Sequence, residues 1–273
     1  MKTTRVFGSL CVFTTLCAVT SLGQSTVFSD DMSGTFSTHW TAQSTASGSV
    51  DFSSGVLLID NNGNSGQTWA YTNLSDFGAP FNIVLSSNEG EVTWAFNMRT
   101  LSSDPSNNNR LAFVLAASSS DFTTGSGYAV RVGGNSPSTD PLELVYYTGG
   151  VNGSIVSIAS GASMTANQYA SVRIAYDPKT NMWRLYGETA SSWTNPSLIS
   201  SLLGSGINST GTSITMTSMG VWSLHTTTAS QDRTFDNISV TAIPEPATCA
   251  AIIGALALAG VVMHRRRQTT ATL

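Results

Sequence analysis

The sequence predicts an all-β protein whose strands stack as a jelly-roll β-sandwich. Short runs of alternating apolar residues recur along residues 24–242, and clusters of Gly, Asn, Asp, Ser and Pro separate them. This period of two, with β-branched and aromatic residues, is typical of strands joined by tight turns. About a dozen such runs without an internal repeat indicate one two-layer domain.

The expected strands follow one another at short intervals. Residues 91–99 show the alternation most clearly, because Trp94 and Phe96 fall on the same face of the strand. Comparable runs cover residues 56–59, 110–116, 128–132, 142–147, 154–158, 171–176, 183–186, 214–224 and 234–240. Residues 196–203 are the exception, since we expect one or two helical turns there, capped by Asn195.

Residues 1–23 are typical of a secretory signal peptide. Lys2 and Arg5 give a positive start, residues 6–19 are mostly apolar, and small residues occupy the positions that signal peptidase requires. We expect cleavage after Gly23, so that Gln24 becomes the first residue of an exported domain that spans residues 24–242.

The C-terminus carries three features in a fixed order. Two prolines around a carboxylate form a rigid extended segment, because each proline fixes its own φ and disfavours helix before it: Pro244, Glu245 and Pro246. Residues 247–263 follow as 17 residues without a charge, close to the shortest helix that spans a bilayer. A basic cluster that would stay cytoplasmic ends the segment: Arg265, Arg266 and Arg267.

This order resembles the PEP-CTERM sorting signal of Gram-negative bacteria that make extracellular polysaccharide. The resemblance implies that residues 243–267 are the sorting signal, with a transmembrane helix, and that residues 268–273 are a cytoplasmic tail. In that family an exosortase in the inner membrane cleaves the signal, and the protein then reaches the cell surface or the matrix. An ordinary C-terminal membrane anchor is the alternative.

Composition limits what the exported domain does. All three cysteines lie in the terminal segments, at Cys11, Cys17 and Cys249, so the domain has no disulfide and depends on its apolar core. Residues 24–243 hold seven Lys and Arg against fifteen Asp and Glu, a net charge of about −8. This charge argues against nucleic acid or an anionic polymer as the main partner.

Residues 169–186 resemble a hairpin of the concanavalin A-like and laminin-G-like sandwiches. A strand ends in Tyr176-Asp177, a polar turn follows, and the chain returns with Trp183 and Leu185 on the apolar face. Residues 28–32 and 235–240 also look like the first and last strands of that fold. The resemblance implies that these two strands lie side by side.

The sequence shows no catalytic constellation. Sandwiches of this type also include glycan-cleaving enzymes, whose acids alternate along one strand. Glu89 and Glu91 are two residues apart, but apolar or neutral residues follow them. With His39 and His225 as the domain's two histidines and no cysteine, neither a nucleophilic triad nor a zinc site is indicated. We expect a non-enzymatic protein, with a divergent glycan hydrolase as the alternative.

Calcium is the one metal that the sequence favours. Asp30 and Asp31 fall in the expected first strand and Asp236 in the last, and neighbouring strands would bring these hard oxygen ligands together. In the competing interpretation, Asp30 and Asp31 cap a turn while Asp236 pairs with Arg233.

A glycan-binding face needs exposed aromatic rings beside polar groups. Trp193 lies in a polar loop, and Trp69 and Tyr71 fall on one face of a strand, so these three are the candidate sugar-stacking residues. Simple packing is the alternative for each of them. Trp94, Trp183 and Trp222 lie in alternating runs and are expected in the core.

Taken together, these features predict an exported surface or matrix protein. Signal peptidase and an exosortase would be its partners during export, with transient residence in the inner membrane, and its sandwich would contact polysaccharide. A purely structural matrix component is a further alternative. No cofactor is expected beyond the candidate calcium ion.

Overall fold

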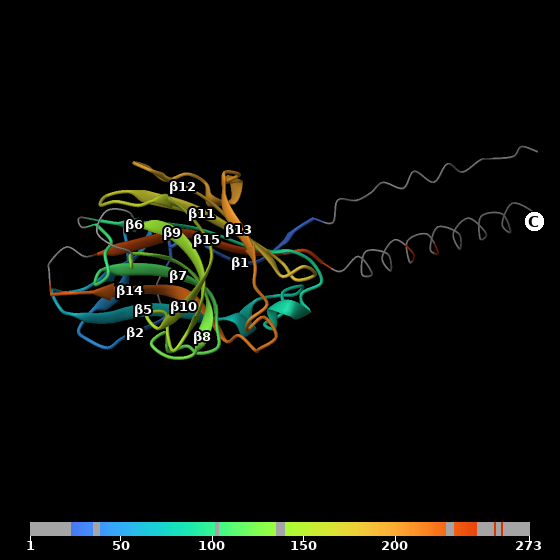
Figure 1. Ribbon diagram of the computed structural model, residues 1–273, viewed down its shortest axis with the longest axis horizontal. Helices are drawn as coiled ribbons and strands as arrows, with labels where there is room; N and C mark the ends of the chain where they lie inside the picture. Colours follow the sequence, from blue (N-terminus) through green and yellow to red (C-terminus); the bar gives the residue numbers. More distant parts are fainter. Residues whose placement is uncertain are drawn as a thin grey trace, which may run out of the picture.

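The computed structural model describes residues 23–34, 39–101, 104–134, 140–227, 232–244, 254 and 258 (Figure 1). The predictions made for residues 1–22, and for Glu245, Pro246, Arg265, Arg266 and Arg267, lie outside this part of the chain. Among the described residues, no helix is both long and apolar enough to cross a membrane.

Two antiparallel sheets face each other and form a sandwich (Figure 1). Sheet A has eight strands, in the order β13 (Leu202–Ile207), β12 (Met182–Ala190), β11 (Tyr169–Asp177), β6 (Val92–Thr100), β15 (Arg233–Ala242), β4 (Val56–Asp60) and β3 (Ser49–Ser53), with β1 (Ser25–Asp30) also paired to β15. Sheet B has seven, in the order β10 (Ser154–Ser163), β9 (Pro141–Thr148), β8 (Ser126–Val132), β7 (Arg110–Ala117), β14 (Ser218–His225), β5 (Gly66–Asn73) and β2 (Thr41–Ser44). The all-β sandwich predicted from the alternating runs is confirmed.

Aromatic rings from both sheets fill the space between them. Phe96 of sheet A stacks on Phe113 of sheet B with ring centroids 3.9 Å apart. Trp183 stacks on Tyr128 of the opposite sheet at 4.2 Å. Offset ring packing of this kind adds to the free energy gained by burying apolar area. The expected burial of Trp94, Trp183 and Trp222 is also confirmed, since all three are fully buried.

The segments that resembled a concanavalin A-like and laminin-G-like sandwich adopt the expected pairings. β11 and β12 form a hairpin in which Tyr176 lies opposite Trp183. β1 runs antiparallel to the second half of β15, with Phe28 opposite Val240. The start of β1 therefore lies beside the end of β15, to the right in Figure 1.

Two local predictions were right only in part. One helical turn forms within residues 196–203, the 3₁₀ turn η4 (Pro196–Leu198), and Asn195 caps it as expected. The turn does not continue to residue 203, because the chain from Leu202 pairs with β12 as strand β13. The expected strand over residues 214–224 begins at Ser218, since residues 208–217 form turns and one isolated bridge from Thr215 to Val84. Two further 3₁₀ turns in the described part of the chain are η2 (Leu74–Asp76) and η3 (Leu85–Ser87).

Candidate functional site

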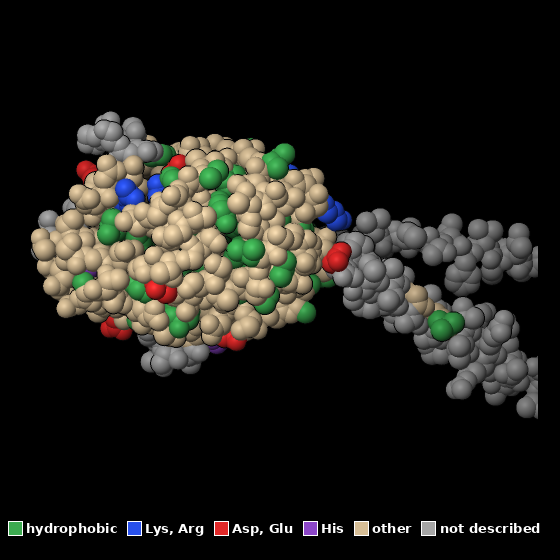
Figure 2. Space-filling view, turned by 60° about the horizontal axis from the view of Figure 1, so that its bottom comes forward, with side chains coloured by type: hydrophobic (Ala, Val, Ile, Leu, Met, Phe, Trp, Pro, Cys, Tyr) green, Lys and Arg blue, Asp and Glu red, His purple; other side chains and the backbone are tan. Residues whose placement is uncertain are grey.

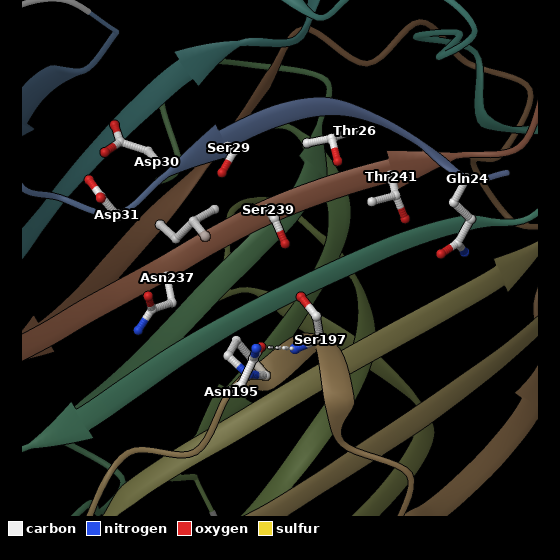
Figure 3. Close-up of a pocket in the computed structure, with 12 residues that line it drawn as sticks. Gln24, Thr26, Ser29, Asp30, Asp31, Asn195, Ser197, Asn237, Ser239 and Thr241 are labelled. Atoms are coloured by element: carbon white, nitrogen blue, oxygen red, sulfur yellow. Dashed lines mark hydrogen bonds between the residues drawn. The ribbon is translucent and has the colours of Figure 1, made fainter.

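A polar groove lies on the outer face of sheet A, where β1, β15 and the η4 turn meet (Figure 3). Its volume is about 480 Å³, within the range of small-molecule sites. Hydroxyl, carboxamide and carboxylate side chains dominate its lining: Gln24, Thr26, Ser29, Asp30, Asp31, Asn195, Ser197, Asn237, Ser239 and Thr241. We call this hollow the sheet A groove.

Strand alternation explains why hydroxyl groups floor the groove. In β15, Ile238 and Val240 are buried in the core, so Ser239 and Thr241 point outward. Ser29 of β1 is paired with Ser239 and is exposed. Because both strands place their apolar residues between the sheets, only short polar side chains remain on the outside.

The wall opposite β1 is the segment from Trp193 to Ile199, which crosses the outer face of sheet A. Side chains of β11 hold it in place. Ser171 Oγ donates to the Thr194 carbonyl at 3.1 Å and accepts from the Thr194 N–H, also at 3.1 Å. Arg173 Nε donates to the carbonyl of Ile199 at 2.8 Å. The η4 turn between these two attachments contacts both β6 and β11.

Two smaller hollows share residues with the groove and extend it. One lies beside it and continues across the sheet from Ser239 and Thr241 to Thr93 of β6 and Arg173 of β11. The other shares Ser29, Asp30 and Asp31 and continues beyond the end of β1 to a second set of residues: Ser33, Gly34, His39 and Phe52. Together with the groove they make a connected track over sheet A rather than a single closed pocket.

The turn after β1 fixes two carboxylates at one end of the groove. Met32 adopts a left-handed backbone conformation with φ of 56° and buries its side chain in the core. Its N–H donates to Asp30 Oδ1 at 2.8 Å, and Trp40 Nε1 donates to Asp30 Oδ2 at 2.9 Å. The hydroxyl and the N–H of Ser33 both bond to Asp31 and hold its pKa below the ordinary value.

Asp236 stands beside these two carboxylates, as the expected pairing of the first and last strands requires. Partial burial raises the pKa of Asp236, and the charges of Asp31 and Asp30 raise it further, against an opposing N–H bond from Asn237. Repulsion among neighbouring carboxylates favours the protonated form of one of them.

The candidate calcium set therefore comes together in space. However, no group of three or more His, Cys, Asp or Glu within the described residues has the geometry to hold a metal ion. Asp30 and Asp31 cap their own turn, as the competing interpretation predicted. The pairing of Asp236 with Arg233 is not seen, because Arg233 donates instead to Asn109 and to the carbonyl of Asp232.

The three candidate sugar-stacking residues differ in exposure. Trp193 is partly exposed, and its ring centroid lies 4.3 Å from that of Tyr169. The guanidinium group of Arg99 lies over the Tyr169 ring. Trp69 is only 4% exposed, and its Nε1 donates to the carbonyl of Ser120 at 2.9 Å. Tyr71 is partly exposed beside it. Trp69 is therefore packed against its neighbours and does not form an open surface for stacking on a sugar.

Two loops account for the burial of Trp69 by covering the outer face of sheet B. Phe122 and Val151 come from loops 118–125 and 149–153 and pack on Trp69, Trp222 and Tyr147. The N–H of Val151 bonds to the carbonyl of Phe122 at 3.0 Å and joins the two loops. Sheet B is thus closed on the side where the sequence predicted a sugar surface.

The groove itself escaped the sequence analysis. Its floor and wall are built from Ser239, Thr241, Asn195 and Ser197, which are individually unremarkable residues in a chain rich in Ser, Thr and Asn. Alternation alone indicated that Ser239 and Thr241 point outward. That a turn from residues 195–197 faces them depends on a contact between segments about forty residues apart in the sequence.

The domain's two histidines lie apart: His39 lines the extension of the groove with Asp30 and Asp31, whereas His225 lines neither the groove nor its extensions. His225 is buried at the end of β14, where Nδ1 lies 2.6 Å from the Asn64 carbonyl and Nε2 lies 2.9 Å from Thr68 Oγ1. Glu91 forms an ion pair with Arg184 at 3.4 Å. These contacts are structural.

Comparison with known proteins returns matches at the level of structure alone. No protein-family model matches the chain, and no curated protein matches its sequence. Among solved structures, lectin II from Ulex europaeus is 14% identical, covering 79% of this chain and 97% of its own, with a TM-score of 0.52. The fold is that of the lectin-like sandwiches.

Two further structures agree with this fold. Lectin UEA-II in complex with galactose is 16% identical over 78% of this chain and 96% of its own, with a TM-score of 0.51. The CBM2 module of an evolved Dit protein from Lactobacillus casei BL23 phage J-1 is 11% identical, covering 81% of this chain and 96% of its own, with a TM-score of 0.52. At these identities the likeness defines the architecture of the chain.

The crowding of carboxylates at the groove predicts that Asp236→Asn stabilises the protein at neutral pH. Because the folded-state pKa of Asp236 is raised, the native state holds its proton more tightly, so this group's contribution to stability falls as pH rises above about 3.8. We expect a melting temperature on the order of 1 °C higher than wild type at pH 7, with the gain vanishing below about pH 4.

Asp177→Asn is the matched control of opposite sign. Although desolvation acts against it, hydrogen bonds from Thr180 and Lys179 lower the pKa of Asp177, so its removal should reduce the melting temperature at pH 7. Calorimetry across pH 3–8 measures both variants. A lower melting temperature for Asp236→Asn at pH 7 would contradict the proposed repulsion.

Proposed function

We propose that this protein is a non-enzymatic, exported polysaccharide-binding protein that contacts its glycan through the sheet A groove. The observation that carries the proposal is the groove itself: a track on a lectin-like sandwich, lined almost entirely by hydroxyls, carboxamides and carboxylates. Such side chains both donate and accept hydrogen bonds, as a sugar's hydroxyl groups do.

The shape of the track favours a polysaccharide over a monosaccharide as the ligand. The groove and its two extensions share lining residues, so they are continuous from the turn after β1, over β1 and β15, to β6 and β11. Polar sites of this kind bind with water at their rims and depend on many modest hydrogen bonds. A polymer that lies along the track would form more of these bonds than a monosaccharide.

The rest of the surface is compatible with a hydrated, sugar-rich environment. Figure 2 shows a face made mostly of backbone and of side chains outside the charged and hydrophobic classes, with charged groups few and scattered. This follows from a composition of only 10% charged residues. The similar structures, which include a lectin in complex with galactose and a CBM2 module, point in the same direction.

The termini support the export part of the proposal. Residues 1–23 have the pattern of a signal peptide, and residues 243–267 resemble a PEP-CTERM signal for an exosortase. In this scheme signal peptidase removes the first segment and the exosortase removes the second. The sandwich then remains at the cell surface or in the extracellular matrix.

Blocking the groove should abolish glycan binding. Ser29 lies where the groove and its acidic extension meet and is exposed, so Ser29→Tyr fills the track without disturbing the core. We expect the wild-type protein to bind at least one polysaccharide on a glycan array, and the variant to bind it about tenfold or more weakly by calorimetry.

Ser157→Tyr is the control, because Ser157 is an exposed strand serine on β10 of the other sheet. Its affinity should match that of wild type. Equal losses in both variants, or no binding to any glycan by the wild type, would refute the proposed role and favour a purely structural one.

The sorting signal is tested separately by replacing both Pro244 and Pro246 with Ala. Without the prolines, the segment loses its fixed extended form and should no longer be presented as a protease substrate. We expect an uncleaved species in the inner-membrane fraction of the producing cells, detected by immunoblotting. Normal processing and surface delivery of this variant would overturn the exosortase assignment.

A further inference from the structure

The sheet A groove is uneven in charge along its length. Asp30 and Asp31 line it directly at one end (Figure 3). Asp236 lies close enough for its pKa to respond to both. Among the described residues that line the track, the one Lys or Arg is Arg173, which lies to the side of the groove on β11, level with Ser239. Arg173 is already engaged there, since it donates to Ile199 and stacks 3.8 Å from the ring of Tyr186.

Of these carboxylates, Asp31 keeps the most accepting capacity, because both oxygens of Asp30 already accept hydrogen bonds. Asp31 is exposed, and the contacts described for it involve Oδ1, from the hydroxyl and N–H of Ser33. Asp236 bonds to its neighbour Asn237, through the N–H at 2.7 Å and through Nδ2 at 2.9 Å. An ionised carboxylate offers about four lone-pair sites, so both side chains retain acceptors for a ligand.

A second polar group near Asp236 lacks a partner. Asn97 lies directly opposite Asp236 in the register, on the same outward face of sheet A. It is fully buried, and within the described part of the chain neither Oδ1 nor Nδ2 has a hydrogen-bond partner. An unsatisfied buried carboxamide costs on the order of 1–3 kcal/mol. The η4 turn that forms the groove's wall contacts β6, the strand that carries Asn97.

The acidic end thus combines fixed negative charge with a buried carboxamide whose acceptor and donor are both unused among the described residues. Asn97 lines neither the groove nor its extensions, so the carboxylates are the groups that meet the ligand. A ligand group that brings several N–H donors and a positive charge matches these carboxylates. An ammonium group does so, because it carries three donors and no acceptor. A uronate or sulfate group would instead meet repulsion from the three carboxylates.

We propose that the sheet A groove selects a polysaccharide with free amino groups, and that a sugar ammonium is held at the end formed by Asp30, Asp31 and Asp236. This inference rests on the proposed function, and it adds the chemical class of the glycan. The hydroxyl-lined remainder of the track holds the neighbouring sugar units, which are neutral.

The test compares two ligands that differ only at the amino group. Glucosamine oligosaccharides from chitosan and N-acetylglucosamine oligosaccharides of equal length from chitin are titrated into the purified protein near pH 6, with a neutral glucan as a third ligand. We expect a Kd about tenfold lower for the glucosamine series than for the acetylated series. Added salt should weaken the binding of the glucosamine series alone, because salt screens the attraction between exposed charges.

Variants that replace a carboxylate with a neutral carboxamide show which residues cause the preference for glucosamine. Asp31→Asn should weaken glucosamine binding about threefold and leave the acetylated series unchanged, and adding Asp236→Asn should remove most of the remaining preference. Asp76→Asn is the control, because it removes the same charge from an exposed residue that lines neither the groove nor its extensions. It should change neither affinity.

Each outcome has a separate meaning. Equal affinity for the two series, or tighter binding of the acetylated one, overturns the amino-sugar inference and leaves glycan binding intact. Equal effects of Asp31→Asn and Asp76→Asn overturn it too, because the preference would then come from the domain's overall negative charge. Absence of binding to all three ligands removes support for the proposed function together with the inference.

Discussion

The candidate site depends on a bulge in strand β15. Residues Arg233, Thr234 and Phe235 of β15 pair with β4, whereas the strand from Ile238 to Ala242 pairs with β1. Between them the register against β6 shifts, and Asn237 takes a left-handed conformation with φ of 51°. A bulge leaves residues unpaired and re-aims their side chains. Here it leaves Asp236 and Asn237 at the gap between two partner strands, and the groove forms along that gap.

The second requirement is a segment that rises above the sheet. A flat outer face with short side chains would give no groove, so depth comes from residues 193–199 crossing over β6 and β11. Ser171 and Arg173 attach that segment at both ends of the η4 turn. Asn195 closes the turn itself by accepting from the N–H of Ser197 at 3.1 Å. The site therefore combines strand geometry from β1 and β15 with a loop fastened by β11.

The features that follow from local periodicity could be predicted from the sequence. The alternation around Trp94 and Trp183 identified core strands correctly, and the Tyr176-to-Trp183 hairpin has the expected pairing. The adjacency of the first and last strands came from a resemblance and is confirmed. Period-two patterning is informative in these cases because one face of the strand is fully apolar.

The remaining features depend on contacts between distant segments. Trp69 alternates in the same way as an exposed residue would, and only the loop that carries Ser120 and Phe122 decides that it is buried. Likewise, nothing local to Leu202 and Leu203 distinguishes a helical turn from a strand until pairing with β12 is known. The bulge at Asn237 has a residue suited to positive φ, but its position relative to β4 and β1 is set by tertiary pairing.

Polysaccharide binding along the bulge of β15 is the central claim, and amide hydrogen–deuterium exchange with and without the tightest-binding glycan tests it most directly. The account predicts slower exchange in the bound state at residues 195–198 and 237–241, with no change in loops 118–125 and 149–153 over sheet B. Protection confined to those two loops, with the groove amides unchanged, would contradict it.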